Sequence, residues 1–151
     1  MTKAKTAKET VEIVLFNGRP RESGNIIPRE TVESIAREIS TGKELALQEL
    51  DPIGRKVAGK SEVEVWKERI MADAVSCRLE GEVLFVTFAI RSNRYGKRFQ
   101  AALNTHGVRG LYFYPVGYGV ADKNGVIPDY HLCYVAFEPR NAMKIDSNGQ
   151  K

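Results

Sequence analysis

The feature that most constrains the fold is the run from Val83 to Ile90, which is apolar throughout except for Thr87. A near-continuous run of β-branched and aromatic residues is typical of a strand covered on both faces. We therefore predict a central strand of a sheet at this position. The 151 residues suit a single domain, because a chain of this size can bury about 70% of its unfolded surface.

Several other segments have the pattern of strands bounded by turn residues. They are Val11–Phe16, Leu45–Leu50, Leu111–Val120 and Tyr130–Phe137. The last two are joined by a loop with an Asn-Gly turn signal, which predicts a hairpin. The region from Val63 to Cys77 has a pattern that fits either a strand or a helix.

Apolar side chains at helical spacing predict two helices. The first has Pro28 in its first turn and Gly42 after its end, and its apolar face consists of Val32, Ile35, Ala36 and Ile39. The second covers Asn93–Thr105, with Tyr95, Phe99, Ala102 and Leu103 on one side, and a short helical turn follows at Gly107–Gly110.

Both ends of the chain are polar. Residues 1–10 form a basic leader that carries Lys3, Lys5 and Lys8, and residues 144–151 form a polar tail. We predict flexible segments there, around one domain at residues 11–143, with an arm that docks on an acidic partner as the alternative for the leader. The sequence predicts neither a signal peptide nor a membrane span.

The sequence lacks the common motifs of nucleotide and metal chemistry, so we predict no cofactor and no metal site. Cys77 and Cys133 lie in predicted buried strands, where a disulfide between them is the alternative to two free thiols. His106 ends a predicted helix, where an imidazolium suits the helix dipole. His131 lies in the last predicted strand, alternates with Cys133, and is interpreted as structural.

Basic and aromatic side chains are the candidates for binding. The basic ones are Lys3, Lys5, Lys8, Arg19, Arg21, Arg91, Arg94 and Arg98. Basic grooves with aromatic platforms can follow a phosphate backbone, but a solvated helix face explains the same charges. The aromatic residues Tyr112, Phe113, Tyr114 and Tyr118 fit packing as well as base stacking.

Four segments, in the same order along the chain, resemble parts of tailed-phage prohead maturation proteases. They are Ile13–Phe16 with the loop and the run Gly24–Pro28, then Leu45–Asp51 followed by Pro52–Arg55, then Gly107–Leu111, and last Leu132–Ala142 with its Pro-x-Asn-Ala end. The resemblance spans residues 11–143. It implies an α+β fold with a mixed, mostly antiparallel sheet, curled or forming a partial barrel, and two or three packed helices.

The departures from the family pattern fall at its catalytic positions. The second segment has Glu49, Leu50 or Asp51 where the family has its histidine. The third segment leads into Tyr112 or a neighbour where the family has its serine. Triad catalysis needs both a nucleophile and a base. The resemblance therefore implies the fold without the activity, with no catalytic residues.

A relative of a prohead protease that lacks the nucleophile is expected to be a capsid-associated structural protein of the virion, present in the host cytoplasm during assembly. Its partner would be the major capsid protein, and copies of the chain could associate on the capsid lattice. An external decoration or cement protein is favoured over an internal head or scaffold component. The alternatives are a hydrolase that uses Cys133 or Thr105 with a histidine, and a nucleic-acid or host-factor binder that uses Arg91–Arg98.

Overall fold

The computed structural model of the chain describes residues 9–19, 24–49 and 67–140. These residues form an α+β fold, in which a six-stranded, mixed and mostly antiparallel sheet has the order β1-β4-β3-β2-β6-β5. The strands are β1 (Thr10–Phe16), β2 (Ala46–Leu47), β3 (Ala72–Glu80), β4 (Val83–Ile90), β5 (Leu111–Tyr118) and β6 (His131–Pro139). The helices are α2 (Arg29–Ser40) and α4 (Arg94–His106), with short 3-10 turns η1 (Lys67–Arg69) and η2 (Val108–Gly110).

The apolar run at Val83–Ile90 is an interior strand, as predicted, because β4 pairs with β1 on one side and β3 on the other. The pattern also predicted a strand covered on both faces, and the structure covers the second face only in part. Buried and half-buried residues alternate along β4, so that only one face belongs to the core. On the other face the guanidinium of Arg78 lies 4.0 Å from the ring centroid of Phe85. The Arg78 side chain thus covers part of the Phe85 ring.

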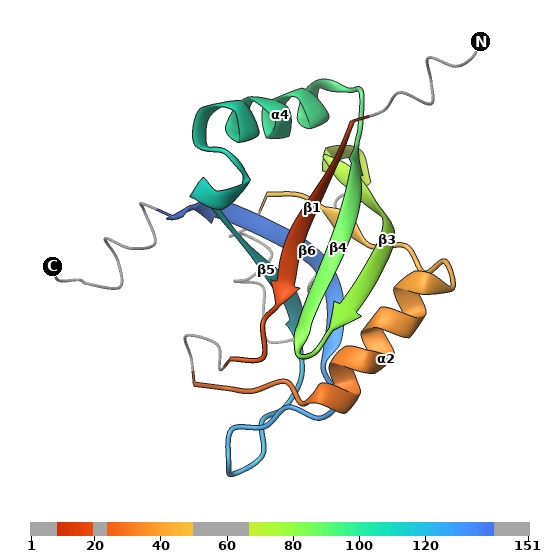
Figure 1. Cartoon of the computed structure of the whole chain (residues 1–151), viewed down its shortest axis with the longest axis vertical. Helices are drawn as coiled ribbons and strands as arrows, with labels where there is room; N and C mark the ends of the chain where they lie inside the picture. Colours follow the sequence, from red (N-terminus) through yellow and green to blue (C-terminus); the bar gives the residue numbers. More distant parts are fainter. Residues whose placement is uncertain (1–8, 20–23, 50–66, 141–151) are drawn as a thin grey trace, which may run out of the picture.

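The sheet consists of two parts that are joined by the very short strand β2. Figure 1 shows β1, β4 and β3 in front and β5 and β6 crossing behind them. Strand β2 pairs antiparallel with β3 and parallel with β6. The predicted strand at Leu45–Leu50 is thus reduced to two paired residues, followed by the buried Gln48, whose backbone N–H donates to the Val135 carbonyl at 3.0 Å.

The sheet is neither curled nor closed, so the predicted curled sheet or partial barrel is wrong. The outer strands β1 and β5 touch, but no ladder joins them in the part of the chain that the structure describes. Pro115 explains the open edge of β5. Pro115 lies opposite Val135 of β6, and the Val135 carbonyl points the other way, toward β2. The backbone nitrogen of Pro115 therefore points away from β6, to the free edge of the sheet. Proline has no N–H, so it cannot donate a hydrogen bond to a further strand there.

Both predicted helices are confirmed. In α2 the buried face consists of Val32, Ile35 and Ile39, and Pro28 is the N-cap rather than a first-turn residue. Helix α4 begins after Asn93, whose side-chain oxygen accepts a hydrogen bond from the Gly96 N–H at 2.8 Å. The fully buried ring of Phe99 holds α4 against β5 and β6, since it contacts Phe113 and Phe137.

The segment before α2 is fixed against the loop between β5 and β6. Ile26 forms a parallel bridge with Val126, and the Thr31 hydroxyl donates to the Pro128 carbonyl at 2.7 Å. The hairpin of β5 and β6 and its Asn124-Gly125 turn are as predicted. This contact places residues 26–29 close to the end of β1.

Several predictions lie outside the described residues. They concern the leader lysines Lys3, Lys5 and Lys8, Arg21, Asp51, part of the ambiguous region Val63–Cys77, and the tail at 144–151. The described end of that ambiguous region belongs to η1 and to strand β3. Within the described ranges, neither helix has the length and apolarity needed to cross a membrane.

Candidate functional site

A cavity of about 620 Å³ lies where β1 and β5 approach each other. Its walls come from β1, from residues 26–29, from the turn between β3 and β4, from η2 and the first half of β5, and from Arg140 after β6. The volume falls in the range of about 300 to 1,000 Å³ that is usual for ligand sites. We take this β1–β5 cavity as the candidate functional site.

Apolar side chains line the β1–β5 cavity and continue onto the surface around it. Leu15 and Leu111 are buried members of the core that reach its wall. Val14, Ile26 and Val108 also line it, yet they are 42%, 37% and 40% exposed. Clustered exposed apolar side chains beside a cavity are a feature of binding sites.

Tyr112 lies in the wall of the β1–β5 cavity. Its ring stacks on that of Tyr114, with centroids 5.4 Å apart, and the Arg140 guanidinium lies 5.7 Å from its ring centroid. The resemblance implies that the family's serine would fall at Tyr112 or at a neighbouring residue. Tyr112 itself is a half-buried aromatic side chain in contact with an arginine.

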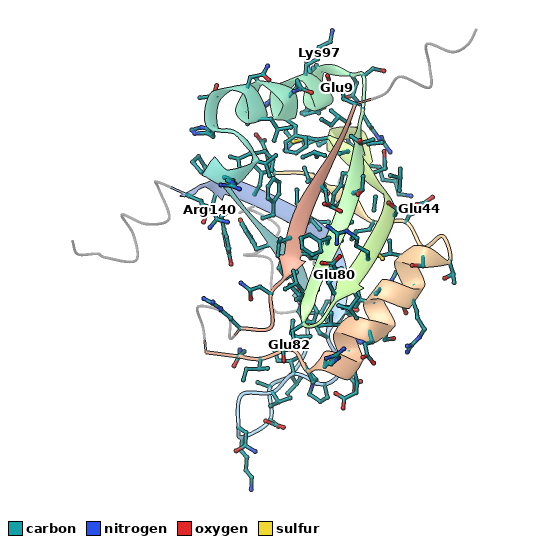
Figure 2. All side chains as sticks on the ribbon, viewed as in Figure 1. Glu9, Glu44, Glu80, Glu82, Lys97 and Arg140 are labelled. Carbon is teal, nitrogen blue, oxygen red and sulfur yellow. The ribbon has the colours of Figure 1, made fainter. Side chains whose placement is uncertain are left out.

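A hydrogen bond from the Arg140 side chain to the Arg109 backbone brings these two residues together. The Arg140 Nε donates to the Arg109 carbonyl oxygen at 2.9 Å, which holds the end of β6 against η2. Arg140 and Glu82 both line the cavity, and Figure 2 shows Glu82 at the turn between β3 and β4, well apart from Arg140. The Arg109–Arg140 end of the cavity is therefore basic.

The other carboxylate in the cavity wall, Glu12, is already engaged by Arg78. The Arg78 Nε and Nη2 donate to its two oxygens at 3.0 and 3.2 Å, and Arg78 also pairs with Glu80. The hydrogen bond from Arg78 holds the pKa of Glu12 below its ordinary value of 4.5, although desolvation acts in the opposite direction.

The substitution Arg78→Gln is expected to raise the pKa of Glu12 toward 4.5. Because the folded-state pKa is lowered, the ion pair stabilises the fold above the ordinary pKa and its contribution is lost as the pH falls through the lowered value. A carboxyl carbon NMR titration of both proteins measures the shift. Lys97→Gln, on the exposed surface of α4, is the control, and an unchanged Glu12 titration in Arg78→Gln would contradict the assignment.

The predicted basic candidates do not form one site. Arg91 makes a bidentate ion pair with Asp73 at 2.7 and 2.9 Å, which raises the pKa of Arg91, and Arg98 pairs with Glu49 at 2.6 Å. Arg94 lies over the ring of Tyr95. Among the predicted basic residues that the structure describes, Arg19 alone lines the β1–β5 cavity.

The two described positions that the resemblance links to catalysis have separate surroundings. Glu49 is half-exposed and bound to Arg98 of α4, and it does not line the cavity that contains Tyr112.

The histidines and cysteines also lie in ordinary structural surroundings. The His131 ring stacks on Tyr118 with centroids 4.9 Å apart. Cys77 and Cys133 are free thiols. Both are half-buried, whereas the sequence predicted buried strands, and the strands β3 and β6 that carry them are partly exposed. Burial raises the pKa of the Cys133 thiol, and the charge of Lys43 offsets this only in part. The described residues contain no cluster of potential metal ligands.

The sequence interpretation missed Arg109 and Arg140 as binding candidates. Arg109 lies between two glycines, Gly107 and Gly110, which is a signal for an exposed turn. Arg140 follows the last strand and has no comparable signal. Their proximity depends on η2 packing beside the end of β6, which local pattern does not reveal.

Comparison with known proteins adds no relative to this description. No family model, no curated protein and no solved structure matches the chain.

Proposed function

We propose that the protein is a non-catalytic binding protein of a tailed-phage head, with a prohead protease-like fold, which attaches to the major capsid shell as an external decoration protein. The proposal uses the β1–β5 cavity as the attachment site. The observation that carries it is the wall of the cavity at Tyr112, where an aromatic side chain lines an apolar, arginine-bearing cavity at or beside the position where the resemblance implies a nucleophile.

The residues at this wall favour contact over covalent chemistry. Tyrosine and arginine are enriched at the buried centres of protein interfaces, where the aromatic ring supplies area at a low entropic cost. The stack of Tyr112 on Tyr114 with Arg140 above it provides both residue types in a fixed arrangement. The association with a phage head follows from the four collinear segments, and the binding role from the cavity.

Two observations weigh against the alternative functions. A raised pKa disfavours the thiolate that a Cys133 nucleophile would need. A nucleic-acid site at Arg91–Arg98 would lose much of its positive potential, because carboxylates neutralise Arg91 and Arg98.

Co-sedimentation with mature and immature heads of the encoding phage tests the proposal. We expect saturable binding to the heads by the unmodified protein. Val108→Asp places a charge at the cavity mouth and is expected to weaken binding by about tenfold or more, which corresponds to about 1.4 kcal/mol. Val75→Asp is the matched control, since Val75 is 57% exposed on β3 and does not line the cavity.

Each outcome has a definite meaning. Absence of saturable binding to either kind of head would overturn the capsid role. Equal loss of binding in Val108→Asp and Val75→Asp would overturn the assignment of the cavity as the attachment site. Circular dichroism melting of both variants establishes that they are folded under the conditions of the assay.

A further inference from the structure

We infer that the β1–β5 cavity receives an extended segment of the partner protein in which acidic residues are combined with apolar ones. The carboxylates would meet Arg109 and Arg140, and the apolar side chains would enter the cavity. This inference rests on the proposed function in taking the occupant to be part of another protein, and it adds the chemistry by which that occupant is recognised.

The charge of the cavity carries the inference. Four of the arginines that the structure describes already have a carboxylate: Arg29, Arg78, Arg91 and Arg98 pair with Glu33, Glu12, Asp73 and Glu49.

In contrast, within the described residues no carboxylate forms a salt bridge with Arg19, Arg109 or Arg140, all of which line the cavity. Of the two glutamates in the cavity wall, Glu12 is engaged by Arg78, which leaves Glu82 at the far end. The cavity thus offers cations to an anionic occupant.

The basic end of the cavity is also preorganised. Arg140 is held through its Nε by the Arg109 carbonyl oxygen and lies against the ring of Tyr112. The terminal nitrogens of a guanidinium fixed in this way can bind a carboxylate in a bidentate manner with little loss of side-chain entropy. The Arg109 side chain takes no part in the backbone contact, so it can be replaced without breaking that hydrogen bond.

The apolar surface favours a polypeptide over a small amphipathic molecule. A small ligand is normally enclosed by its pocket for most of its surface. Here the apolar wall continues outward through Val14, Ile26 and Val108, which are between 37% and 42% exposed. An occupant that covers these residues extends out of the cavity, as a peptide segment does.

Retention of defined peptide pools on the immobilised full-length protein tests the inference. One pool contains peptides of about eight residues, a common strand length, in which Asp or Glu alternates with Leu, Ile, Val or Phe. The second pool has Lys or Arg in place of the acidic residues, and dodecanoate is assayed separately as a small amphipathic anion. Mass spectrometry quantifies the retained peptides, and light scattering of the free protein reports self-association.

We expect the acidic pool to be retained at least about tenfold more than the basic pool, an effect of at least about 1.4 kcal/mol. Arg109→Glu should remove most of this preference, whereas Lys97→Glu, a change of the same sign and size on the exposed surface of α4, should preserve it. The preference should also weaken in high salt, because the Debye length falls from about 10 Å at 0.1 M to about 3 Å at 1 M.

Equal retention of the two pools would overturn the inference, as would equal effects of Arg109→Glu and Lys97→Glu. Binding of dodecanoate without retention of peptides would overturn it in favour of a small anionic ligand. Self-association that is lost in Arg109→Glu, again without retention of peptides, would overturn it in favour of a second copy of the chain. These results are independent of the head-binding assay. If the protein binds heads but shows no preference for acidic peptides, only this inference is refuted. If it prefers acidic peptides but does not bind heads, only the capsid role is refuted.

Discussion

Phe99→Ala is expected to lower the free energy of unfolding by about 4 kcal/mol, within the range of about 3 to 5 kcal/mol for large core truncations. The ring is completely buried, and it contacts Phe113 edge-on at 6.2 Å and Phe137 at 5.1 Å between centroids. Its loss removes the aromatic contacts between α4 and the strands β5 and β6. Urea unfolding followed by circular dichroism measures the change.

Phe99→Leu is the control for this substitution, because it keeps most of the buried volume and should cost less than about 1.5 kcal/mol. Similar losses for alanine and leucine at this position would contradict the role of Phe99 as the packing contact of α4. Since α4 leads directly into η2, we also expect the alanine variant to show increased amide exchange at Val108 and Arg109.

Gly96→Ala is expected to destabilise the protein by about 3 kcal/mol, although helix propensity alone would predict a gain of about 1 kcal/mol. A Cβ at Gly96 would lie 1.7 Å from the Arg91 carbonyl oxygen. Arg91 cannot easily retreat, because its N–H donates to the Met71 carbonyl at 2.8 Å and its guanidinium pairs with Asp73. The steric conflict therefore decides the sign of the effect.

Thermal unfolding distinguishes the two expectations for Gly96. A loss of about 3 kcal/mol corresponds to a fall in Tm of about 6 to 12 °C for a chain of this size. Lys97→Ala, at the next and exposed position of α4, is the control and should change stability by less than about 0.5 kcal/mol. A Tm for Gly96→Ala at or above that of the unmodified protein would contradict the close packing of α4 on Arg91.

Local sequence pattern was sufficient for most elements of the fold. The spacing of Val32, Ile35 and Ile39 identifies α2, and the apolar run at Val83–Ile90 identifies an interior strand. These signals are local because each helix or strand has apolar residues at a characteristic spacing within its own sequence. The extent of β2 could not be predicted in the same way, since its two residues are defined by partners in β3 and β6.

The candidate site was less accessible to sequence reasoning than the fold. Arg19 and Tyr112 were identified as residues of interest, but for different reasons and without a link between them. The β1–β5 cavity arises from strands at opposite ends of the sheet order, and it acquires its basic end only when Arg140 reaches the Arg109 carbonyl. Charge counting was misleading for Arg91 and Arg98, because the carboxylates that neutralise them are distant in the sequence.

The short strand β2 also has a consequence for the order of folding. Hairpins β3–β4 and β5–β6 pair neighbouring segments, whereas β2 joins β6 through Ala46 and Tyr134, which lie far apart in the chain. Local pairings form before distant ones because less loop entropy is lost. During synthesis, β2 therefore cannot pair with β6 until this last strand has emerged from the ribosome. Only then do the two hairpins become one cooperative unit.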